Sequence, residues 1–83
     1  MNIEEELKLV RKAQRNVESF EELYDLYFPK VYGFIMTKIR NQELAEDLTS
    51  EVFIKILEAL PKFQARGLPF GAWVFRIVRN HLK

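Results

Sequence analysis

Apolar residues recur at helical spacing along most of the chain, and this periodicity is the feature that most constrains the fold. The pattern is clearest in residues 42–60, where apolar side chains fall four residues apart: Leu44, Leu48, Val52, Ile56 and Leu60. Such spacing places side chains on one face of an α-helix, and no segment shows the strict alternation of a half-buried strand. The sequence therefore predicts an all-α fold.

Four periodic segments indicate four helices. Their expected limits are residues 3–15, 19–40, 42–60 and 69–82. The stretch between the last two, residues 61–69, contains two prolines and a glycine and is predicted as a loop. Short connections favour helices that pack as neighbours. Since 83 residues leave room for one domain only, we expect a compact bundle of about four helices over residues 1–83.

Polar residues and prolines mark the expected helix limits. Ser19 and Glu22 have the spacing of a capping box, which would start the second helix. Asn41 is expected to cap the third helix. Pro29 cannot donate an amide hydrogen to the carbonyl of Asp25, so a kink or a break is predicted within the second helix.

The residue types present exclude several kinds of site. The chain has no cysteine and one histidine, His81, which excludes thiolate and histidine-cluster metal sites and a cysteine nucleophile. No apolar run approaches the ~20 residues of a bilayer span, and the first residues are acidic, unlike a secretion signal. We expect a cytoplasmic protein that is not an enzyme, contacts no membrane and holds no metal or cofactor.

Charge is unevenly distributed although the net charge is only +1. Residues 1–29 carry a net −3 and residues 30–60 a net −1, whereas residues 61–83 carry +5 with no acid. At about 100° per residue, Arg76, Arg79, Asn80 and Lys83 fall opposite the apolar face of the last helix. A face of one sign attracts polyanions, although most charged helix faces are merely solvated.

Aromatic residues accompany these basic residues. Rings offer stacking surfaces to unpaired bases while basic groups follow the phosphate backbone, so single-stranded nucleic acid is a candidate partner. Phe70 and Trp73 lie on the apolar stripe of the last helix and are interpreted mainly as packing residues. Phe63 and Arg66, in the predicted loop, are better candidates for contact with a ligand.

The polar side of the third helix carries an apolar residue. Ile54 lies beside Asp47, Ser50 and Glu51, away from the core stripe. An isolated exposed isoleucine is common, but an apolar residue with a polar rim is also typical of a protein-docking surface. Glu43 joins this row of carboxylates, which is interpreted as a solvated helix face rather than a cation site.

Two blocks of sequence carry a resemblance to a known family. They are AEDLTSEVFIK at residues 45–55 and PFGAWVFRIVRN at residues 69–80, with Phe63 between them and FEELY upstream at residues 20–24. In order and spacing they resemble region two of the extracytoplasmic-function (ECF) sigma factors of bacterial RNA polymerase. The resemblance covers nearly the whole chain and implies an all-helical region-two domain that acts in transcription initiation.

The resemblance also implies two binding surfaces. The third helix of such domains docks on the clamp helices of the largest subunit of core RNA polymerase; the matching positions here are Asp47, Ser50, Glu51 and Ile54. The loop and the fourth helix hold the non-template strand of the minus-ten promoter element and trap a flipped base, which helps to melt the DNA. The matching positions here are Lys62, Phe63, Gln64, Ala65, Arg66, Gly67, Arg76, Arg79 and Asn80.

An alternative interpretation remains open. The family's second helical domain, which reads the minus-thirty-five element, is not expected within these 83 residues. A sigma-like bundle that only binds proteins, as a decoy or as the target of an anti-sigma factor, would show the same acidic helix. The two interpretations differ in one property, because only a promoter-binding domain would prefer single-stranded to duplex DNA.

Overall fold

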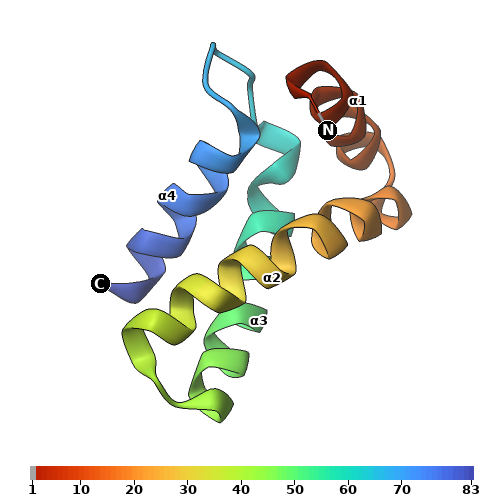
Figure 1. The fold of residues 1–83 in the computed structure, drawn as a ribbon. Helices are drawn as coiled ribbons and strands as arrows, with labels where there is room; N and C mark the ends of the chain where they lie inside the picture. Colours follow the sequence, from red (N-terminus) through yellow and green to blue (C-terminus); the bar gives the residue numbers. More distant parts are fainter. Residues whose placement is uncertain (1) are drawn as a thin grey trace.

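Helix α2 (Phe20–Ile39) crosses the molecule, and α1 (Ile3–Arg15) and α3 (Gln42–Ala59) pack against it in the computed structural model (Figure 1). Helix α4 (Phe70–Leu82) packs on α3 and α1. Two short 3-10 helices, η1 (Val17–Ser19) and η2 (Leu60–Lys62), lie before α2 and after α3. The structure describes residues 2–83, so Met1 of the predicted domain lies outside the described residues. The all-α prediction is confirmed.

The start of α3 follows the sequence prediction, whereas the start of α2 does not. Asn41 caps α3, since its Oδ1 accepts a hydrogen bond from the Leu44 amide at 3.0 Å. Ser19 makes no capping hydrogen bond because its backbone is already helical, with φ −74° and ψ −10°. The extended residue is Asn16, whose Oδ1 accepts from the Glu18 amide at 3.0 Å and starts η1. The predicted capping box at Ser19 is therefore wrong.

Helix α2 runs through Pro29 without interruption, so the predicted break is wrong. Pro29 and Asp25 both lie on the exposed side of α2. Water can therefore satisfy the carbonyl that proline leaves without a donor. On the other side, Tyr27, Val31 and Ile35 are buried in the core, and this packing favours a continuous helix.

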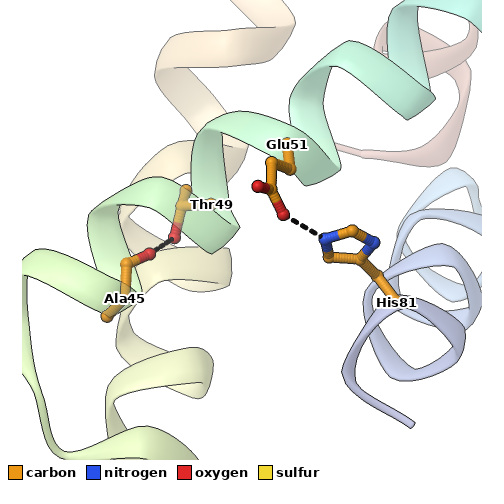
Figure 2. Close-up of polar contacts among 4 residues, drawn as sticks. All are labelled: Ala45, Thr49, Glu51 and His81. Carbon is orange, nitrogen blue, oxygen red and sulfur yellow. Dashed lines mark hydrogen bonds and ion pairs between the residues drawn. The ribbon is translucent and has the colours of Figure 1, made fainter.

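The core contains the inner faces of all four helices. From α4 it takes Phe70, Val74 and Val78, and from α3 it takes Val52 and Ile56. Thr49 of α3 is fully buried and donates its hydroxyl hydrogen to the Ala45 carbonyl at 2.7 Å (Figure 2). No helix within residues 2–83 is long and apolar enough to cross a bilayer.

The segment between α3 and α4 leaves a loop on the surface. Helix α3 ends at Ala59, one residue before its predicted end, and Pro61 lies inside η2. Residues 63–69 then lead into α4 without regular structure. Gly67 has a φ of +83°, a left-handed conformation that favours glycine. This loop and the outer face of α4 form the surface described next.

Candidate functional site

The loop and α4 enclose a hollow of about 440 Å³ on the surface. Its lining consists of Phe63, Gln64, Arg66, Leu68, Ala72, Trp73, Arg76 and Arg79. A second hollow of about 320 Å³ shares five of these residues and adds Lys62. We call the two hollows together the basic groove. It gathers six of the nine residues predicted to contact DNA.

The charge of the basic groove is uncompensated. Lys62, Arg66, Arg76 and Arg79 line it, and no carboxylate does. The single contact between a basic side chain and a carboxylate within residues 2–83 joins His81 to Glu51, so none of these four cations has a carboxylate partner there. Arg66 donates from Nε to the Gln64 Oε1 at 2.9 Å, which ties two residues of the loop together. The groove therefore offers positive charge to an anionic ligand.

Aromatic rings form one wall of the basic groove. Phe63 packs against Trp73 and Phe70, with ring centroids 5.0 and 5.2 Å apart. Phe70 is 1% exposed and belongs to the core, as the sequence predicted. Trp73 is half-buried and packs against the core, as the sequence predicted, and it also lines both hollows. Its position one helical turn before Arg76 is the signal that could have identified it.

Three of the predicted DNA contacts do not line the groove. Ala65 and Gly67 are exposed on the loop, and Gly67 supplies its left-handed turn. Asn80 is exposed but lines a different hollow, between α3 and α4, together with Lys55, Ala59, Ile77 and His81. The structure therefore separates Asn80 from Arg76 and Arg79, although all three lie on the exposed side of α4.

The residues predicted to dock on a protein are all exposed on α3: Asp47, Ser50, Glu51 and Ile54. Ile54, 58% exposed, and Ser50 line an apolar hollow of about 300 Å³ between α2 and α3. Tyr24 from α2, 38% exposed, forms its other side and packs on Phe53 with centroids 4.7 Å apart. The sequence pattern did not indicate Tyr24, because only the packing of α2 on α3 brings it beside Ile54.

Glu51 makes a contact within the chain that the sequence did not predict. Its Oε1 lies 2.8 Å from Nε2 of His81 on α4 (Figure 2). The contact joins α3 to α4, the helix that carries one side of the basic groove. Asp47 has no hydrogen bond or ion pair from its side chain among the described residues, so it is the simpler residue with which to test docking. Within residues 2–83, no group of three potential metal-ligating side chains comes together.

The chain is similar in sequence to a known family and to several known proteins. The sequence model of the Sigma-70 region 2 family matches residues 23–83. The chain is 40% identical over 75 residues to the ECF RNA polymerase sigma factor BldN of Streptomyces coelicolor, which aligns 89% of this chain with 28% of BldN. It is 32% identical to the RNA polymerase sigma-H factor of Pseudomonas aeruginosa, over 96% of this chain and 42% of that protein.

A further relative is the ECF RNA polymerase sigma factor SigW of Bacillus subtilis, 29% identical over 96% of this chain and 41% of SigW. The chain thus spans less than half the length of each of these relatives. No solved structure gives a significant match.

Proposed function

The chain belongs to the Sigma-70 region 2 family, and on that premise we propose that it is the domain of an ECF-type transcription initiation factor that binds promoter DNA and core RNA polymerase. The DNA ligand is the non-template single strand of the minus-ten element, which lies in the basic groove. The observation that carries this proposal is the groove itself, which is lined by two aromatic rings and by four cations that have no carboxylate partner among residues 2–83.

The groove has the chemistry that a separated strand requires. Neutralising phosphates releases counterions and favours binding, and a ring that stacks on a base contributes about 1–3 kcal/mol per base. Extruding a base from a duplex costs a few kcal/mol. Because Trp73 and Phe63 lie among Arg66 and Arg76, one site can offset that cost by stacking and by phosphate contacts together. The domain favours melted DNA by binding it, with no covalent step.

The exposed residues of α3 form the second proposed surface, which docks on the clamp helices of the largest polymerase subunit. Asp47 and Glu51 supply negative charge, and Ile54 with Tyr24 supplies an apolar hollow beside it. An apolar centre with a polar rim is the usual composition of a protein interface. The residues that line this hollow and those that line the basic groove do not overlap, as simultaneous binding of both partners requires.

The DNA proposal is tested by comparing single-stranded with duplex DNA. Fluorescence anisotropy measures binding of the chain to a short labelled single strand of mixed sequence and to the same strand in a duplex. We expect tighter binding of the single strand. Equal affinity for both forms, or no binding of either, would favour a sigma-like bundle that binds proteins only, as a decoy or an anti-sigma target.

The docking proposal is tested with Asp47→Lys, because Glu51 also contacts His81 and its replacement would disturb the packing of α4 on α3. Capture of the chain by immobilised bacterial core RNA polymerase should be lost in Asp47→Lys. Glu22→Lys makes the same charge change at an exposed position of α2 and is the matched control. Equal capture of both variants would show that α3 is not the docking helix.

A further inference from the structure

Gln14 of α1 connects to the segment that begins the loop. Its Nε2 donates to the Leu60 carbonyl at 3.0 Å and to the Phe63 carbonyl at 2.8 Å. Leu60 opens η2, and Phe63 is the first residue after it. Figure 1 shows α1 and this loop at the same end of the molecule. The sequence pattern places Gln14 on the apolar stripe of α1, where a polar side chain has no evident role.

The loop has few other restraints. No backbone–backbone hydrogen bond within residues 2–83 involves residues 64–68. The start of the loop is fixed by the Phe63 amide, which donates to the Leu60 carbonyl at 3.0 Å, and by the two bonds from Gln14. A primary amide has two N–H donors, so one side chain can serve both carbonyls. Both bonds are half-buried, which limits the access of water as a substitute.

The position of the Phe63 backbone determines the shape of the basic groove. The Phe63 ring lies against Trp73, at 5.0 Å between centroids, and both rings line the two hollows. A shift of the Phe63 carbonyl would move this ring relative to Trp73 and change the wall on which a base would stack. Gln14 itself lines neither hollow. Any effect of Gln14 on DNA binding is therefore indirect, and its bond to the Phe63 carbonyl offers the most direct route.

We propose that Gln14 is a positioning residue for DNA binding, which holds Phe63 and the start of the loop in the conformation that receives the single strand. The inference rests on the proposed function of the groove. It assigns a role to α1, which lies outside residues 23–83 that match the family. If loss of Gln14 lets the loop leave this conformation, the apparent affinity for DNA falls in proportion to the fraction of molecules that remain competent.

Two variants remove the donor. Gln14→Met keeps the length and the helix propensity of the side chain, and Gln14→Glu keeps its shape but cannot donate when ionised. Gln42→Met is the matched control, because Gln42 donates only to Glu46 on the exposed surface of α3, at 3.2 Å. We expect the affinity of both Gln14 variants for a labelled single strand to fall about fivefold, the factor that corresponds to loss of the hydrogen bond to Phe63 at about 1 kcal/mol.

Two further measurements distinguish positioning from other roles. The slope of log affinity against log salt should stay unchanged in Gln14→Met, because this variant neither adds nor removes a charge. Acrylamide quenching of the single tryptophan, Trp73, should increase in the folded variants without DNA, since Phe63 no longer covers it. Capture by core polymerase should be the same as for the parent chain.

The proposal is overturned if Trp73 quenching and DNA affinity match those of the parent chain. It is also overturned if both Gln14 variants lose their helical circular dichroism, since Gln14 would then hold the fold rather than the loop. Failure of the parent chain to bind DNA would refute the proposed function instead. The quenching measurement needs no DNA and would still decide whether Gln14 holds Phe63.

Discussion

Replacing Arg76 and Arg79 by glutamine should change how DNA binding depends on salt. Both side chains are exposed on α4 and line the basic groove without a carboxylate partner among the described residues. Glutamine removes the charge but keeps a good helix former at each position. The double variant should therefore keep the fold and lose two phosphate contacts.

The size of the effect follows from the cations in the groove. Four of them line it, and each phosphate contact with a single strand contributes about −0.7 to the slope of log affinity against log salt. If all four contact phosphates, the slope is about −2.8 for the parent chain and about −1.4 for the double variant. A fourfold rise in salt, from about 50 to about 200 mM, should then weaken the parent about 50-fold and the variant about 7-fold.

Anisotropy titrations at several salt concentrations measure both slopes. The matched control is Arg11→Gln with Arg15→Gln, which makes the same charge change on exposed positions of α1 outside the groove. Its slope should equal that of the parent. Equal slopes for the Arg76/Arg79 variant and the parent would refute the assignment of the groove as the phosphate-binding surface.

Three further predictions concern stability and are checked by thermal or denaturant unfolding. Gly67→Ala should lower the free energy of unfolding by about 1 kcal/mol through strain alone, because its φ is +83° and a Cβ there meets no atom within 4 Å; an unchanged value would contradict this. Phe70→Ala should lower it by about 3–5 kcal/mol, since Phe70 is fully buried among aromatic rings; a loss below 1 kcal/mol would show that the ring is dispensable. Burial and the hydrogen bond that Tyr27 donates to Glu6 at 2.7 Å raise the pKa of the Tyr27 hydroxyl, so the folded state holds this proton more tightly than the unfolded state. That stability is present below the ordinary pKa of about 10 and is lost as the pH rises above it; Tyr27→Phe should remove this part of the loss, and an identical pH profile would contradict the assignment.

Much of the fold follows from local patterns. Helical spacing of apolar residues gave the limits of α1 and α4 to within a residue, and Asn41 was correctly identified as a cap. Ser19 was misassigned because the capping-box pattern does not reveal that Ser19 already has a helical backbone as the last residue of η1. The break considered at Pro29 does not occur, because the packing of α2 outweighs one missing hydrogen bond.

The candidate site was predicted only in part, for a related reason. Periodicity shows which residues share a face of one helix, and this was enough to bring Arg76 and Arg79 to an exposed side. It does not show which other element lies beside that face. Trp73 in the groove wall, Tyr24 beside Ile54 and the contact of Glu51 with His81 all depend on how two helices pack together.

The separation of two surfaces on one small domain is tested most directly by a nuclear magnetic resonance titration with single-stranded DNA. The indole N–H of Trp73 gives one resolved probe inside the basic groove, because the chain has no other tryptophan. We predict that DNA shifts this signal and the amides of residues 62–66 and 76–79, and leaves Asp47 and Ile54 unchanged. Shifts centred on α3, with the Trp73 signal unmoved, would contradict the assignment of the basic groove as the DNA-binding surface.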